Sequence, residues 1–294
     1  MSTINEIVVH AGTFHADDVC CVAMMEIINP NIKVTRTFNV REYDLNADSG
    51  TIVANIGGGR FDHHGEPKLR ENGSLHCAAT LLWERFGADV VRTVAPELDD
   101  EGVEIAVKTV DSKLLSTVAA GDNGEINTVL CTVNTVISTF NPNWDEPEMG
   151  NRYFSEAVEF SKRIITNEIN RSASVTRGKL IVEKAIRESE NQVVVLPVFC
   201  PWQGAVCATD ALVIVFPSQR GGWNIQMVPE KPGSFDTRIK VPDSWKGKSG
   251  ADAESECPGM SFCHPSGFLC AFTRREDAVN AAYFLTRKET ERNA

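Results

Sequence analysis

Residues 5–19 read NEIVVHAGTFHADDV, and this stretch decides how the first part of the chain folds. The apolar run at 7–9 is typical of a short buried strand. A loop with two histidines follows it, and a helix is predicted over 17–28, where Asn-Pro ends it. Asp17 and Asp18 suit the start of this helix, because carboxylates are favoured at a helix N-terminus.

The pattern then repeats along the first half of the chain. Strands are predicted over 32–38 and 51–56, and helices over 76–86 and 99–120. We expect Gly87 to end the first of these two helices. Strands that alternate with helices are typical of a parallel α/β sheet.

The later part of the chain has a different order of predicted helices and strands. Its predicted elements are a mainly helical stretch over 151–190, strands over 192–199, 210–218 and 223–229, and a final helix over 276–287. We therefore predict an α/β protein with a parallel-sheet domain over 1–140, a helical connector over 141–190 and a smaller α/β domain over 191–294.

Composition excludes several classes of protein. The formal net charge of −11 disfavours non-specific binding to duplex nucleic acid, which needs a basic surface. It leaves room for a small anionic substrate. No apolar run reaches the roughly 18 residues of a membrane helix, and no signal or transit peptide is evident. We expect a cytoplasmic protein without membrane contact. No CxxC pair occurs among the cysteines, which disfavours a cysteine zinc site.

Histidines gather near two predicted strand ends. His10 and His15 follow the first strand, and His63 and His64 follow the strand at 51–56. Ligand sites of open α/β sheets form at the carboxyl ends of the strands, so these four side chains should share one edge. His76 instead precedes a helix, where it fits a cap or a surface position.

Carboxylates complete this predicted group. Asp17 follows His15 closely, and Asp122 in the segment VAAGDNGE offers a further carboxylate. Imidazole and carboxylate ligands together suit Mn, Zn, Fe or Co. Two such ions can activate water and hold the oxygens of a phosphoryl group. The residues therefore predict a site for one or two divalent metal ions.

The motifs around these residues resemble the DHH phosphoesterase superfamily, in particular its melanocyte-proliferating-gene branch, also described as metal-dependent protein hydrolases. Three motifs of the first half carry the resemblance: HAGTFHADDV, IGGGRFDHH and AAGDNG. Three more lie in the second half: WNIQMVP, PGSFDTR and HPSGF. The motifs occur in the family's order between about residues 7 and 285, so the resemblance implies a DHH-like N-terminal lobe and a smaller C-terminal lobe.

The resemblance implies roles for the site residues. Related enzymes use paired manganese, so His10 and His15 should hold one ion, and Asp17, His63 and Asp122 the other. Zn²⁺, Co²⁺ or Mg²⁺ are alternatives to Mn²⁺. Asp62 and His64 should orient ligands or face the phosphate, and with Asp122 they form the expected catalytic set. Branch members act as RNA exonucleases, which implies phosphodiester hydrolysis.

Two positions depart from the family pattern. Asn55 stands where the superfamily has an aspartate that bridges both metals, and Ala119 replaces the first aspartate of the motif that contains Asp122. A neutral amide is a poor bridge. Asn55 therefore leaves three possibilities: weakened catalysis, a single-metal enzyme or a binding protein on an enzyme scaffold. It also fits an ordinary structural amide at a strand end.

The second domain should contact the substrate. Arg220 precedes two glycines, Arg238 follows PGSF and His264 lies in HPSGF. Arginine binds phosphate with two parallel hydrogen bonds. Together with His64, these residues form the predicted substrate-binding set. The alternative for the arginines is a hairpin turn and a solvated side chain.

Three functions follow from these patterns. The leading one is a divalent-metal phosphoesterase that hydrolyses a phosphodiester, as an RNA or oligonucleotide exonuclease or a nucleotide phosphohydrolase. Its partner would be a small phosphorylated or single-stranded nucleic acid substrate, and a homo-oligomer is compatible with the sequence. The second is a nucleotide- or RNA-binding protein that lost turnover through Asn55. The third, a zinc-dependent amide hydrolase, lacks the HExxH motif or an obvious glutamate base.

Overall fold

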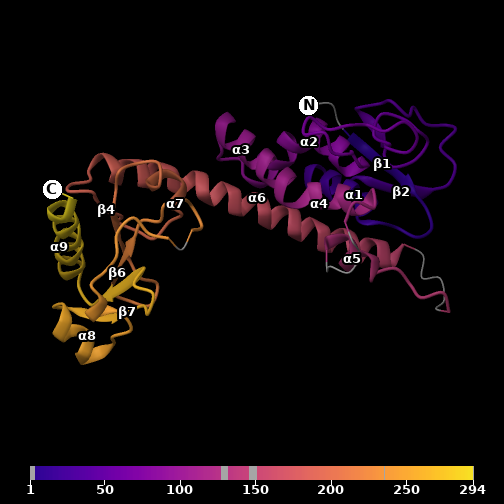
Figure 1. Cartoon of the computed structure of the whole chain (residues 1–294). Coiled ribbons are helices and arrows are strands. Elements are labelled where there is room, and N and C mark those ends of the chain that lie inside the picture. The colour runs from indigo at the N-terminus through magenta and orange to yellow at the C-terminus, as the bar shows by residue number, and fades with distance from the viewer. Residues whose placement is uncertain (1–3, 127–131, 146–150, 235, 294) are drawn as a thin grey trace. The chain divides into compact units, whose positions relative to one another are not determined.

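The structure is a computed structural model that describes residues 4–126, 132–145, 151–234 and 236–293. The chain forms two compact units, Met1–Ala173 and Ser174–Ala294, and the boundary falls inside the long helix α6 (Arg152–Arg187). Figure 1 shows this helix running from the magenta part of the chain into the orange part. The fold is mixed α/β, with a parallel sheet in the first unit and a mixed sheet in the second.

The first unit contains a sheet of three parallel strands. They are β1 (Ile4–His10), β2 (Lys33–Thr37) and β3 (Gly50–Val53), in the order β2-β1-β3. The predicted parallel sheet is thus confirmed, with β1 in its centre. Because all three strands run the same way, the segments that follow β1 and β3 leave the sheet at one edge.

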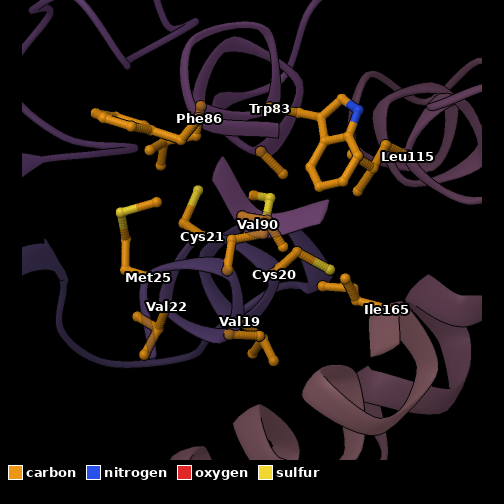
Figure 2. Packing of buried hydrophobic residues seen from close by; sticks show 14 of the residues in the cluster. Val19, Cys20, Cys21, Val22, Met25, Trp83, Phe86, Val90, Leu115 and Ile165 are labelled. Carbon is orange, nitrogen blue, oxygen red and sulfur yellow. The ribbon is translucent and has the colours of Figure 1, made fainter. Parts of the chain in front are cut away.

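Helices pack around this sheet in the first unit. They are α1 (Ala16–Ile28), α2 (Ala78–Val94), α3 (Asp100–Val110), the π-helical turn Asp111–Leu115, α4 (Ser116–Asp122), α5 (Val133–Ser138) and the first half of α6. The core lies between α1 and α2, where Cys20 and Met25 pack near Trp83 and Phe86 (Figure 2). Ten residues of α1 are buried, so it is a core helix whose first turn is fixed in place.

The prediction that Gly87 ends a helix was wrong. Gly87 lies inside α2, which continues to Val94. A Cβ at this position would come within 2.8 Å of the Trp83 ring, so glycine serves close packing here and not termination. The helix predicted over 99–120 is present, but the π-helical turn interrupts it before Ser116.

The second unit contains a five-stranded sheet in the order β4-β5-β6-β8-β7. Its strands are β4 (Val193–Val195), β5 (Val213–Pro217), β6 (Trp223–Met227), β7 (Met260–Cys263) and β8 (Leu269–Phe272). Only β4 and β5 are parallel; the other pairs are antiparallel. The β7–β8 hairpin, which follows a Pro/Gly/Ser-rich stretch, was not predicted.

One face of this sheet is covered by α9 (Arg275–Asn293), whose Ala278 and Ala282 belong to the same buried cluster as the strands. The end of α6, through Val182 and Ala185, covers part of the opposite face beside β4 and β5. The remaining short elements are α7 (Gln203–Val206), a 3-10 turn at Asp243–Trp245 and α8 (Gly250–Glu256).

The predicted division at residues 140 and 190 stays a prediction. The stretch expected to be a connector holds α6, whose first half packs with the first unit through Ile165 and Ile169. Among the described residues, no helix combines the length and the apolar character that crossing a membrane requires.

Candidate metal centre

Asp18 lies at the centre of the first group of polar side chains. One of its oxygens is 2.7 Å from His10 Nε2 and accepts a hydrogen bond from the His15 amide at 3.1 Å. Its other oxygen accepts a hydrogen bond of 2.9 Å from Asn55 Nδ2. The carboxylate is fully buried. The sequence singled out Asp17 as a ligand and missed Asp18, which had only been assigned to the helix start.

His10 is oriented from both sides. Its Nδ1 lies 2.9 Å from the carbonyl oxygen of Ala11, while its Nε2 faces Asp18. The hydrogen bond with Asp18 raises the pKa of His10 above its ordinary value, although partial burial acts against this. His15 is exposed, with its ring centroid 5.9 Å from that of His10. The structure therefore places both predicted histidines beside Asp18.

Asp17 points in a different direction from Asp18, although the two residues are adjacent. Its oxygens accept hydrogen bonds from the amides of Ala78 (3.0 Å) and Ala79 (2.6 Å), at the start of α2. Burial raises the pKa of Asp17 to about 7, and the neighbouring carboxylates of Asp122 and Asp18 add to this. The α2 N-terminus partly offsets the cost of burying this charge.

His63 joins Asp17 to Asp122. Its Nε2 is 2.9 Å from Asp122 Oδ2, and its Nδ1 is 3.6 Å from Asp17 Oδ2. The hydrogen bond with Asp122 raises the pKa of His63. Asp122 is the last residue of α4, which brings a carboxylate from a distant part of the sequence to the sheet edge. The structure thus brings together the three side chains that the resemblance had grouped.

The glycine-rich turn after β3 holds Asp62 and His64. Asp62 Oδ2 accepts a hydrogen bond from the Gly58 amide at 2.7 Å, and its Oδ1 lies 2.7 Å from His64 Nδ1. Burial opposes ionisation of Asp62, but hydrogen bonds from the His64 amide, the Gly58 amide and the His64 ring hold its pKa below the ordinary value. The His64 side chain is 64% exposed, so it faces solvent while Asp62 orients it.

Lys68 supports the same turn. Its ammonium group donates hydrogen bonds to the carbonyl oxygens of Gly59 (3.0 Å), Arg60 (3.3 Å) and Asp62 (2.5 Å). Gly59 also lies so close to Leu45 that a Cβ would come within 2.1 Å of the Leu45 carbonyl oxygen. The path of the turn is therefore fixed by packing and by one cation, neither of which the motif itself shows.

Asn55 is buried beside these groups and has a left-handed backbone, with φ of 60°. Asparagine tolerates this conformation better than most residues. Its Nδ2 binds Asp18, but its Oδ1 has no hydrogen-bond partner among the described residues. The Nδ1 atom of His63 is likewise buried without such a partner. Two unsatisfied buried acceptors or donors at one place are unusual and call for an explanation.

Arg36 contributes a cation that the sequence did not predict. It lies on β2, and its Nη2 donates a hydrogen bond of 2.5 Å to the carbonyl of Gly12 in the loop between His10 and His15. Its guanidinium carbon is 4.3 Å from the centroid of the Phe154 ring and 5.5 Å from that of Phe14. Two aromatic rings thus hold this charge at the sheet edge that carries the histidines.

Among the described residues, three sets of side chains could each hold a metal ion, with ligand atoms within 4.8 Å of one another. They are His10, His15 and Asp18; Asp17, His63 and Asp122; and Asp62, His63 and His64. Neutral imidazole and carboxylate are the ligand types of first-row divalent metals. The unpaired atoms of His63 and Asn55 also fit a cation, which would accept their lone pairs. The residues present therefore suit a divalent metal.

The predicted substrate residues of the second unit lie in separate places. Arg220 is exposed in the turn between β5 and β6. His264 lies in the turn between β7 and β8, where its Nδ1 is 2.8 Å from Ser266 Oγ and its ring packs on Phe268 at 4.6 Å. Their part in substrate binding stays a prediction.

Arg238 has a structural reason to be arginine. Its Nη1 donates to the carbonyl oxygens of Thr209 (2.6 Å) and Ala211 (2.8 Å), and its Nη2 donates to that of Cys207 (2.7 Å). The half-buried side chain thus links two segments of the second unit. It lies after β6 and donates to three carbonyl oxygens of the segment before β5. Phe235 of the same PGSFDTR motif lies outside the described residues.

Replacement of Arg238 by methionine is expected to lower the free energy of unfolding by about 3 kcal/mol, because it leaves three carbonyls without their charged donor. Urea denaturation measures this, with Lys240→Met at an exposed neighbour as the control. Unchanged stability together with weaker phosphate binding would instead assign Arg238 to the substrate, as the sequence suggested.

A parallel α/β unit with histidines and aspartates at its strand ends defines a class of protein with a candidate metal centre. The chain belongs to the family described as "Uncharacterised protein family (UPF0160)", whose model matches residues 6–284. The match covers nearly the whole chain, including both units.

Relatives in several organisms match most of this chain. A protein of Rattus norvegicus named MYG1 exonuclease is 27% identical, over 93% of this chain and 82% of its own length. MYG1 exonuclease of Homo sapiens is 26% identical over 93% and 83%. MYG1 protein of Dictyostelium discoideum is 22% identical over 92% and 93%. No solved structure matches the chain. The names of the mammalian relatives support a nuclease-type function in broad terms.

Proposed function

We propose that this protein is a divalent-metal-dependent phosphodiesterase that acts as an exonuclease on single-stranded RNA or short oligonucleotides, with Mn²⁺ as its metal. The observation that carries the proposal is the convergence of two His/Asp groups on one edge of the parallel sheet. The proposal also places the family within the DHH phosphoesterase superfamily, on the strength of its motifs. The relatives named exonuclease agree with a nuclease activity.

The ligand sets differ in one respect from those that the motifs implied. We assign His10, His15 and Asp18 to one ion, and Asp17, His63 and Asp122 to the other. Asp18 supplies a carboxylate beside Asn55, at 2.9 Å from its amide nitrogen, which compensates in part for the neutral side chain there. When bound, divalent ions lower the pKa of water and stabilise charge on phosphoryl oxygens.

The chain's own residues would orient the substrate. His64 is exposed and held through its Nδ1 by Asp62, and in its imidazolium form its remaining ring nitrogen can donate a hydrogen bond to a phosphate oxygen. Arg36, fixed against two aromatic rings, adds positive charge near His10 and Asp18. The anionic backbone of a single-stranded nucleic acid can approach His64 and Arg36. The net charge of −11 disfavours binding of a long duplex.

A second function is favoured by one observation. Asn55 stabilises the buried Asp18 carboxylate with a hydrogen bond from its amide, as a protein without a bridging metal would need. On this alternative, the chain binds RNA or nucleotides and does not hydrolyse them.

One assay separates the two functions. The protein is stripped of metal with a chelator, dialysed, and incubated with end-labelled single-stranded RNA with and without added Mn²⁺. We expect stepwise release of nucleotides only with Mn²⁺, and no cleavage of a peptide substrate. Stoichiometric RNA binding without cleavage under all metal conditions would contradict the phosphodiesterase and support the binding protein.

A further inference from the structure

The second unit has a cavity on the sheet face that α9 does not cover. Its volume is about 630 Å³, and β5, β6, β7 and β8 all contribute to its floor or walls. Along β6, Ile225 and Met227 point into the core beneath α9, so Asn224 and Gln226 point to the opposite face. The cavity is therefore a half-covered sheet face formed by residues of the second unit.

A single row of paired residues crosses this floor. The strand register pairs Phe216 with Asn224, Asn224 with Ala271, and Ala271 with Phe262. Two aromatic residues thus end the row, while an amide and a small side chain occupy its middle. The two ends are three strand spacings apart, or about 14 Å. Phe199 packs on Phe216 at a centroid distance of 5.3 Å and extends that wall.

These aromatic walls are open to solvent. Phe262 is 38% exposed and Phe199 is 46% exposed. Each presents part of a ring to the cavity, and a flat aromatic ligand could stack on it. Nucleobases stack on aromatic side chains without regard to sequence, since every base has a π-face.

Two amide side chains of the cavity, Asn224 and Gln226, have no hydrogen-bond partner among the described residues. Both side chains are half-buried. Amides are uncommon in the middle of strands. Side by side in a concave surface, they offer donors and acceptors of the kind that match the edge of a base.

The charge of the cavity favours an anion. Arg220, in the β5–β6 turn, is the one charged side chain among the described residues that line it. None of the described residues that line it is an aspartate or glutamate, although the chain has 40 acidic against 29 basic residues. A ligand with an aromatic body and one or two negative charges fits this combination.

We propose that this cavity binds a nucleotide, with the base against Phe262 or Phe199, its edge on Asn224 and Gln226, and its phosphate on Arg220. The proposal does not depend on hydrolysis, because it concerns a cavity of the second unit and is tested on metal-free protein. It identifies a binding site that is separate from the His/Asp groups of the first unit.

The test is isothermal titration of the full chain with nucleoside 5′-monophosphates in the presence of a chelator. Phe262→Ala should weaken binding about five- to 150-fold, the effect of losing one base–aromatic stack. Arg220→Gln should weaken it about ten- to 100-fold, the effect of losing one charge-assisted contact. Phe284→Ala is the matched control, since Phe284 is 50% exposed on α9 but packs on Trp245. It should bind like the unaltered protein.

Two further probes define the ligand. Ribose 5-phosphate should bind at least about fivefold more weakly than the nucleotides, because it has no base to stack. His63→Ala should leave nucleotide affinity unchanged, which separates this cavity from the metal centre. If the protein did not hydrolyse RNA but bound nucleotides as described, the proposed function would fail and the nucleotide site would stand.

Several results would overturn the proposal. They are equal binding of ribose 5-phosphate and nucleotides, unaltered affinity in both Phe262→Ala and Arg220→Gln, or the absence of nucleotide binding to the full chain. A change of molecular mass in solution caused by Phe262→Ala would assign the face to contact between two copies instead.

Discussion

Replacement of His63 by alanine is expected to remove one metal ion per chain and to reduce phosphodiester hydrolysis at least about 100-fold. His63 contacts both Asp122 and Asp17, so its loss breaks the second ligand set in the middle. Loss of a supporting residue around a metal already costs 10- to 100-fold in affinity or activity, and loss of a ligand should cost more. Elemental analysis and the RNA assay measure the two effects.

His76→Ala is the control for this variant. His76 is another buried histidine of the first unit, but its ring contacts Thr80 and Glu84 and belongs to none of the three ligand sets. We expect full metal content in this variant, even where stability falls. Unchanged metal stoichiometry in His63→Ala would remove His63 from the ligands and with it the second site.

Replacement of Asn55 by aspartate is expected to act in opposite directions with and without metal. Without metal, a carboxylate would replace the amide that donates to Asp18 at 2.9 Å, so a hydrogen bond would become a repulsion between like charges. The free energy of unfolding should fall by about 2–4 kcal/mol. With Mn²⁺, the added carboxylate can bridge two cations, so metal affinity should rise at least about tenfold.

Denaturation in chelator and in Mn²⁺ measures both parts of this prediction. Asn55→Gly is the matched variant, because glycine accepts the backbone φ of 60° while offering no ligand. It should lose stability without any gain in metal affinity. If Asn55→Asp were as stable as the unaltered chain in chelator and bound metal no better, Asn55 would be a structural amide and no replacement for a bridging ligand.

The sequence predicted the parallel sheet of the first unit well, because the sheet depends on local patterns. An apolar run that ends at His10 and a second strand before the glycines were enough to predict two of its strands, with a pair of histidines after each. The order β2-β1-β3 makes β1 and β3 neighbours, which the chain order alone does not state.

Other features could not be predicted, because they depend on direction or on distant contacts. Asp17 and Asp18 are adjacent in sequence, but successive helical residues point about 100° apart. One therefore reaches α2, and the other reaches His10 and Asn55. Nothing in the motifs distinguishes them. Arg36 gains its position from Phe154, which lies more than a hundred residues away.

Features of the second unit were missed for a similar reason. The motif around Arg238 did not show that its guanidinium group donates to three carbonyl oxygens of residues 27 to 31 positions earlier, and its role in phosphate binding stays a prediction. The β7–β8 hairpin follows a segment rich in turn-forming residues, and its strands have only four residues each. Short strands of this kind are defined by their partners and not by their own pattern.

The two hydrogen bonds from α2 to Asp17 affect how members of this family can be sorted by activity. On the proposed function, a lineage that abandons hydrolysis is free to change His63, whose contacts would serve the metal centre. It is not free to change Asp17, because the buried amides of Ala78 and Ala79 would lose their acceptor. An aspartate at position 17 therefore reports a folded first unit, in active and inactive descendants alike. On the proposed function, position 63 is the better guide to whether a descendant still works as an enzyme.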